Sequence, residues 1–242
     1  MSVGKSISHE SAEGHVTGAA LYTDDLVPRY PGCLHAWPIQ VMAARARVDA
    51  MHLDEVRSHP GVVAVLTADD VPGENDTGAA RRDEALFPVG ETAYWGQAVA
   101  WVLAESEEAA KIASLKAKID FTPLEAITTI EQAIEAESFH TEPGEIARGD
   151  LDAAFRDAPH TATGQLYVGG QEHFYLETQA AIADVDEAGS VLIQSSTQHP
   201  TETQEIVARV LGIADREVVH RIAAATLDGD GAAVLEHVDQ LA

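Results

Sequence analysis

The stretch from residue 96 to residue 124 constrains the fold of this chain more than any other. Its segment AVAWVLA (98–104) is a continuous apolar run of strand length. Ser106 then offers an N-cap, and two acidic residues behind it suit the positive end of a helix. A second strand-like segment, KIDF (118–121), follows. This strand–helix–strand order predicts a right-handed crossover between two strands of a shared sheet.

Composition narrows the class of protein. Hydrophobic residues make up 45% of the 242, which is enough for a buried core. Fifteen basic against forty acidic side chains give a net charge of −25, which disfavours nucleic acid as a partner. Cys33 is the single cysteine, so an intramolecular disulfide and a thiolate metal cage are excluded. No stretch approaches the roughly 18 apolar residues of a membrane span, so we expect no membrane partner. The N-terminal residues have no apolar segment typical of a signal peptide, so we expect a cytoplasmic protein.

The remaining sequence alternates short strand and helix patterns. The first twenty-odd residues are small and polar and predict extended chain or loop. A helix is expected after Asp150, and several strands between residues 160 and 197, including the aromatic segment 166–177. Pro200 at a first helical position and Gly212 just past the last one predict a helix between them.

The segment GGQEHFYLET (169–178) is unusual for a strand because it begins with two glycines and three polar residues. Gln171 offers two donors and an acceptor without charge. Gly169 and Gly170 carry no side chain, so a bulky ligand can approach the backbone there. The alternative is that the glycines form a bulge that bends a strand. The residues alone leave both interpretations open.

Other candidate sites are weaker. His173 and Glu177 are four residues apart, but in a strand they would lie about 13 Å apart, so we predict no protein-ligated metal. Cys33 is interpreted as a small hydrophobe buried in a strand rather than as a nucleophile. The segment LDGDGAAV (227–234) places Ala232 at a ligand position of a calcium loop, which disfavours calcium binding.

Three segments together resemble the molybdenum hydroxylases, most closely the molybdopterin-binding subunit of bacterial xanthine dehydrogenases. They are GAALYTDDLVPRYPGCLHAWPI, GGQEHFYLET and SSTQHPTETQEIVARVLG, and the similarity runs from about residue 3 to about residue 221. The resemblance implies an α+β fold. The implied parts are an α/β hammerhead domain (1–125), a connector (126–148), the first, truncated part of a molybdopterin-binding domain (149–221) and a tail foreign to the family (222–242).

The resemblance also implies a chemistry. In the family the glutamine of the GGQEH motif hydrogen-bonds an oxo ligand of molybdenum, so the resemblance assigns that role to Gln171. It also implies that Gly169 and Gly170 let the cofactor approach the backbone. The cofactor is the molybdenum–molybdopterin of the intact enzyme. That enzyme hydroxylates purines such as xanthine or hypoxanthine with water as the oxygen source, and electrons leave through an iron–sulfur/FAD subunit.

The sequence departs from the family after EVVHRI (217–222), where a glycine-rich loop is expected and AAATLDGDG follows. The catalytic general-base glutamate of the family lies in a later motif, so we expect no complete catalytic set here. We therefore predict that this chain alone binds no molybdenum, is inactive, and self-associates through exposed strand edges. A frameshift is one hypothesis for the alanine tract, which the nucleotide sequence would test. The alternative function is a non-catalytic interaction or assembly module built on the hammerhead domain.

Overall fold

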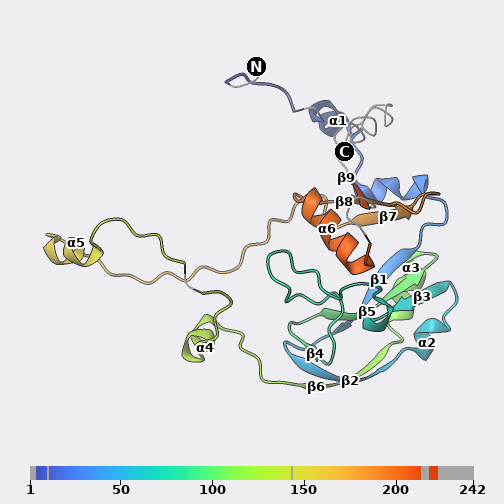
Figure 1. Cartoon of the computed structure of the whole chain (residues 1–242), viewed down its shortest axis with the longest axis horizontal. Coiled ribbons are helices and arrows are strands. Elements are labelled where there is room, and N and C mark those ends of the chain that lie inside the picture. The colour runs from blue at the N-terminus through green and yellow to red at the C-terminus, as the bar shows by residue number, and fades with distance from the viewer. Residues whose placement is uncertain (1–3, 10, 143, 214–217, 223–242) are drawn as a thin grey trace. The chain divides into compact units, whose positions relative to one another are not determined.

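The computed structural model describes residues 4–9, 11–142, 144–213 and 218–222. The chain divides into two compact units, one made of Met1–Leu124 with Leu176–Ala242 and the other of Glu125–Tyr175. Figure 1 labels the elements of each unit. The predicted tail, apart from Ile222, and the weak calcium-loop candidate at 227–234 lie outside the described residues.

The first sheet is built around β5 (Gln97–Ala104). This strand lies between β1 (His35–Val41) and β3 (Val62–Leu66) and is antiparallel to both. Helix α3 (Glu107–Ser114) packs against the sheet through side chains that are small enough for close approach, those of the fully buried Ala110 and Ala113. The predicted cap is confirmed, because the Ser106 hydroxyl accepts a hydrogen bond from the backbone N–H of Ala109 at 3.2 Å.

The second sheet contains the strand that follows α3. Its centre is β2 (Ala46–His52), which pairs antiparallel with β4 (Glu91–Thr92) and with β6 (Lys118–Pro123). The predicted crossover within a shared sheet is therefore wrong, since β5 and β6 belong to different sheets. The physical reason is that β1 and β3 already occupy both sides of β5, so no neighbouring edge is free for β6.

One hydrophobic core joins the two sheets with α2 (Asp54–Arg57) and α3. Side chains of β5 are buried along most of its length, which explains why its sequence is apolar without alternation. The buried cluster consists of Ile39, Val41, Ala43, Ala46, Leu53, Val56, Val65, Val99, Ala100, Val102 and Ala113.

A third sheet lies in the same unit and contains β7 (Ala181–Val185), β8 (Val191–Ser195) and β9 (Val218–Ile222). Strands β7 and β8 form an antiparallel hairpin, whereas β8 and β9 are parallel and are connected through α6 (Pro200–Leu211). The predicted ends of this helix are confirmed, because Pro200 is its first residue and Gly212 adopts the left-handed conformation with φ of 68°.

The hairpin between β7 and β8 is closed by one acidic side chain. The Asp186 carboxylate accepts hydrogen bonds from the backbone N–H groups of Ser190 at 2.8 Å and Ala188 at 2.9 Å. Hydrogen bonding by Ser190 in particular holds the pKa of Asp186 below its usual value. A separate small apolar cluster joins β8 to α6 and contains Ile193, the fully buried Ala208 and Val207.

The unit Glu125–Tyr175 has two short helices and no strand in its described residues. The helices are α4 (Ile130–Glu135), capped by Thr129, and α5 (Leu151–Asp157), capped by Asp150 as predicted. No described residue of this unit is buried. Its large apolar side chains are exposed: Ile127, Ile130, Ile134, Phe139, Ile146, Leu151, Phe155, Leu166, Tyr167, Val168, Phe174 and Tyr175.

The N-terminal region differs from expectation in two places. A short helix, α1 (Ala12–Thr17), forms within the segment predicted to be extended, and Gly18 ends it in the left-handed conformation. Cys33 is half-buried and precedes β1 rather than lying in it, because the turn after Tyr30 extends to this residue. Over the described residues, no helix combines the length and apolar character that crossing a membrane requires.

Candidate functional site

The GGQEH segment is the principal candidate from the sequence, and it lies in an irregular, exposed stretch. Gly169, Gly170 and Gln171 are all exposed, and a Cβ added at either glycine would meet no atom within 4 Å. Among the described residues none hydrogen-bonds the Gln171 side chain. The strand predicted over 166–177 is therefore wrong, and with it the bulge interpretation, because a bulge requires a paired strand.

A local reason for the missing strand lies just after Gln171. Phe174 has a φ of +50°, which is uncommon for a residue with a bulky side chain. Its backbone N–H donates a hydrogen bond to the Glu172 carboxylate at 3.2 Å. Aromatic and β-branched residues favour a strand only where another strand can pair with it. The described residues supply no such neighbour here, so local hydrogen bonding determines the conformation.

Glu177, the other half of the weak metal pair, has a different partner. Its carboxylate accepts a hydrogen bond from the backbone N–H of Thr23 at 2.6 Å. Thr23 is only 1% exposed, and in the part of the chain that the structure describes its buried hydroxyl has no hydrogen-bond partner. The described residues bring together no group of three His, Cys, Asp or Glu side chains that could hold a metal ion.

The N-terminal segment around Thr23 also contacts the third sheet, through Tyr30. Thr23 opens the 3-10 helix η1 (Thr23–Arg29), in which the Asp25 carboxylate accepts from the N–H of Tyr22 at 2.9 Å. The Tyr30 hydroxyl, just after η1, is hydrogen-bonded to the side-chain amide of Gln194 in β8. Neither long-range contact could be predicted from the sequence, because each joins residues more than 150 positions apart.

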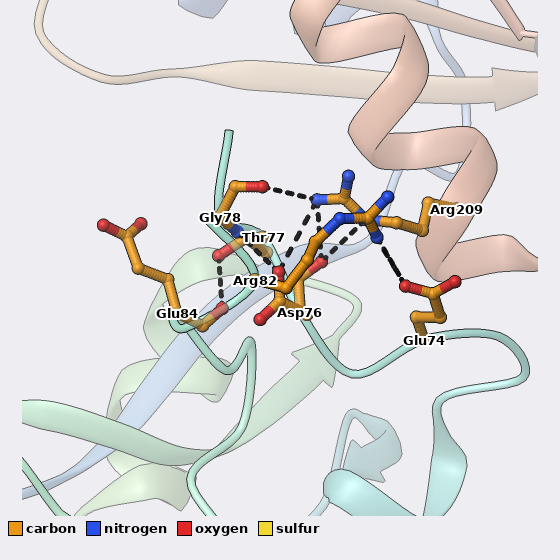
Figure 2. Close-up of polar contacts among 7 residues, drawn as sticks. All are labelled: Glu74, Asp76, Thr77, Gly78, Arg82, Glu84 and Arg209. Carbon is orange, nitrogen blue, oxygen red and sulfur yellow. Dashed lines mark hydrogen bonds and ion pairs between the residues drawn. The ribbon is translucent and has the colours of Figure 1, made fainter. Parts of the chain in front are cut away.

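Several hydrogen bonds join α6 to the loop of residues 72–84, which we call the 72–84 loop (Figure 2). The N–H of Gly73 donates to the Val210 carbonyl at 2.9 Å, and the N–H of Glu74 donates to the Arg209 carbonyl at 3.1 Å. The Arg209 guanidinium reaches the carbonyls of Asp76 and Gly78. The sequence of this region is polar and contains glycine, which predicts only a loop.

A shallow cavity of about 640 Å³ lies at the other end of α6, between the first turn of the helix and Ala79 of the same loop. Its lining includes His199, Thr201, Glu202 and Glu205. Glu202 lies in the first turn of α6 and already places a negative charge at the positive end of the helix dipole, so the arrangement does not favour an anion.

Two known families match the chain in succession. Residues 17–125 match the aldehyde oxidase and xanthine dehydrogenase a/b hammerhead domain, and residues 134–224 match the molybdopterin cofactor-binding domain. The chain is 38% identical over 221 residues to the xanthine dehydrogenase/oxidase of Rattus norvegicus and 39% identical over 223 residues to the xanthine dehydrogenase of Emericella nidulans. Each alignment covers 91% of this chain and 16% of the relative, so the chain spans about one sixth of those proteins.

Solved structures lead to the same family. The aldehyde oxidoreductase from Desulfovibrio gigas is similar over 87% of this chain and 25% of its own, with a TM-score of 0.78 and 26% identity. The quinoline 2-oxidoreductase from Pseudomonas putida 86 is similar over 92% of this chain and 30% of its own, with a TM-score of 0.76 and 25% identity. The predicted α+β fold and the resemblance are confirmed: the chain belongs to the molybdenum hydroxylase family and consists of a hammerhead domain followed by the start of a molybdopterin cofactor-binding domain.

Proposed function

We propose that this chain is the N-terminal part of the molybdenum-cofactor subunit of a xanthine dehydrogenase-type purine hydroxylase. The observation that carries the proposal is the succession of the two family matches in one chain, together with 38–39% identity to proteins named xanthine dehydrogenase. The reaction would be the hydroxylation of xanthine or hypoxanthine with water as the oxygen source. The partner would be the iron–sulfur/FAD part of the same enzyme, and the domain limits predicted above belong to this proposal.

The described residues match only a small part of a cofactor site. Gln171 presents an uncharged amide, and the two glycines before it leave the backbone open to a large ligand. These features suit the role that the resemblance assigns to this residue. When bound, molybdenum–molybdopterin would supply the redox chemistry of hydroxylation, and the protein would bind and orient it.

One amide does not retain a cofactor. Binding a group of that size costs several kcal/mol in lost translational and rotational freedom, so many contacts from several segments are needed. The described residues contribute the exposed run 169–171 and no enclosing walls. We therefore propose that this chain by itself retains no molybdenum and oxidises no purine, and we derive no catalytic step from it.

A second candidate is a non-catalytic interaction or assembly module. The specific observation in its favour is that residues 35–123 form two sheets around a shared buried core, so this part can stand as a fold without the cofactor domain. The exposed apolar side chains of Glu125–Tyr175 would then favour self-association. A reading frame for the remaining subunit directly downstream would support the enzyme proposal, and its absence would support the module.

The role of Gln171 can be tested in the assembled enzyme that contains this chain. We expect Gln171→Ala to lower purine-dependent dye reduction by roughly 10- to 100-fold, the usual cost of removing a group that supports a metal site. Gln165→Ala is the matched control, because Gln165 is the same residue type and is exposed in the same unit. Equal activities of the two variants would refute the assigned role.

A further inference from the structure

The C-terminal end of α6 is covered by backbone from a distant part of the chain. The last four carbonyls of a helix have no partner within the helix. Here two of the carbonyls in the last turn, those of Arg209 and Val210, accept from the N–H groups of Glu74 and Gly73. The Arg209 carbonyl also accepts from the N–H of Gly212, the residue that caps the helix, at 3.2 Å, so at Arg209 the 72–84 loop adds a second donor.

Gly73 lies at the closest point of this contact. A Cβ added there would be 2.2 Å from the Arg209 carbonyl oxygen and 2.6 Å from the Gly212 nitrogen. Both neighbours are backbone atoms of the helix end, so neither can turn aside as a flexible side chain would. The φ of Gly73 is not in the left-handed region, so close approach rather than backbone conformation requires glycine here.

The Arg209 side chain adds hydrogen bonds to the same contact, as Figure 2 shows. One terminal nitrogen donates to the Gly78 carbonyl at 2.9 Å and to the Asp76 carbonyl at 3.2 Å, and Nε lies 3.3 Å from the Asp76 carbonyl. The carboxylates of Asp76 and Glu74 are farther away, at 3.7 Å and 4.0 Å. The side chain is only 13% exposed. Its main partners are therefore backbone carbonyls rather than acids.

The loop that receives Arg209 is held in shape by its own hydrogen bonds. The Glu84 carbonyl accepts from the N–H of Thr77 at 2.7 Å and from its hydroxyl at 3.0 Å. The Asn75 side chain donates to the Phe87 carbonyl at 2.7 Å and accepts from the Phe87 N–H at 2.9 Å. Phe87 is buried, so the loop is tied to the interior of the hammerhead domain.

We propose that Arg209 is a positioning residue that locks α6 onto the hammerhead domain by spanning the carbonyls of Asp76 and Gly78. Helix α6 lies between the parallel strands β8 and β9 in the chain, so the contact holds the helix of this crossover on the hammerhead domain. The importance of this lock for cofactor binding rests on the proposed function. The lock itself is a property of this chain alone.

The test is site-resolved amide hydrogen exchange in the full chain. Lysine keeps the positive charge but has a single nitrogen and lacks the planar fork. We expect Arg209→Lys and Arg209→Met both to speed exchange of the Gly73 and Glu74 amides by about tenfold or more, while the Val102 amide in β5 changes by less than about twofold. A purely structural loss of stability would speed all three amides alike and would overturn the proposal.

The Arg209→Lys variant distinguishes the effect of the planar guanidinium group from the effect of its positive charge. If Arg209→Lys exchanges like the wild type, the contact depends on the ion pairs with Glu74 and Asp76, and the proposal is wrong. Arg156→Met, at an exposed arginine of α5, is the control and should change none of these rates. Because exchange is read without any cofactor, this result is independent of the proposed enzyme activity.

A second variant covers the case in which the arginine variants do not fold. Gly73→Ala leaves Arg209 in place but forces the two backbones apart, so the Glu74 amide should again exchange faster while Val102 does not. Gly164→Ala is the matched control, because an added Cβ there meets nothing within 4 Å. Wild-type exchange at Glu74 in Gly73→Ala would show that the close approach is not required.

Discussion

Residues 35–123 and residues 125–175 both contain many large apolar side chains, but only the first region buries them. The hammerhead part has two sheets whose inner faces meet, so side chains such as Val56 and Val102 are fully enclosed. The second region has well-capped helices and no buried described residue. Capping residues therefore allow helices to form in both regions. A buried core also requires a second sheet or helix whose apolar face can pack against the first, and only the first region has one.

The largest expected difference is in protease resistance. We expect a low concentration of a broad-specificity protease to cleave residues 125–175 at least a hundredfold faster than residues 35–123, because cleavage requires exposed and locally open backbone. Mass spectrometry of the early fragments would locate the cuts. Comparable cleavage in the two regions would mean that the second region is packed against something in solution, with self-association as the first explanation to examine.

Matched valine truncations sharpen the comparison energetically. Val102→Ala removes two buried methyl groups from the central strand and should lower the free energy of unfolding by about 2 kcal/mol. Val168→Ala, at a side chain that is 64% exposed, should change it by less than about 0.5 kcal/mol. Urea denaturation of both variants measures the difference, and equal losses would contradict the distinction between the regions.

The helix caps give a smaller effect of the same kind. Ser106→Ala removes the cap of α3, which packs on the first sheet, and should lower the free energy of unfolding by about 1 kcal/mol. Asp150→Ala removes the cap of α5, which has no buried residue, and should leave the unfolding midpoint unchanged. A destabilisation by Asp150→Ala as large as that by Ser106→Ala would show that α5 folds together with the core.

The smallest effect concerns acid sensitivity in the hammerhead part. The backbone N–H of Thr67, at 2.8 Å, and its hydroxyl, at 2.9 Å, hold the pKa of Asp70 below its usual value. A carboxyl whose pKa is lower in the folded state contributes stability above its unfolded pKa, about 3.9, and loses it as pH falls through the folded value. We expect Asp70→Asn to be slightly less stable than wild type at pH 7 and the difference to vanish well below pH 4. Thermal unfolding across this range measures it, and a pH-independent difference would contradict the account.

Local sequence signals predicted the local structure well. The caps at Ser106 and Asp150 and the ends of α6 follow from side-chain chemistry within a few residues, and the structure confirms them. The crossover from β5 to β6 was predicted wrongly because sheet membership depends on which strands already flank β5. That information lies in β1 and β3, far away in the sequence.

The candidate site likewise depends on residues that are distant in the sequence. Gln171 was found from its motif, but its surroundings could not be predicted, because the strand expected around it needs a neighbour that the described residues do not supply. The contact of Arg209 with the 72–84 loop had only a weak signal, a basic residue in the last turn of a helix. Its partners are backbone carbonyls more than 130 positions away, which no side-chain pattern reveals.

Metal analysis of the purified chain tests the central claim most directly. We propose that Gln171 offers one contact to a molybdenum cofactor and that the described residues do not supply the rest of the site. After expression in a host that makes the cofactor, we expect well under one tenth of an equivalent of molybdenum per chain and no purine-dependent dye reduction. One equivalent of molybdenum retained through gel filtration would contradict the account.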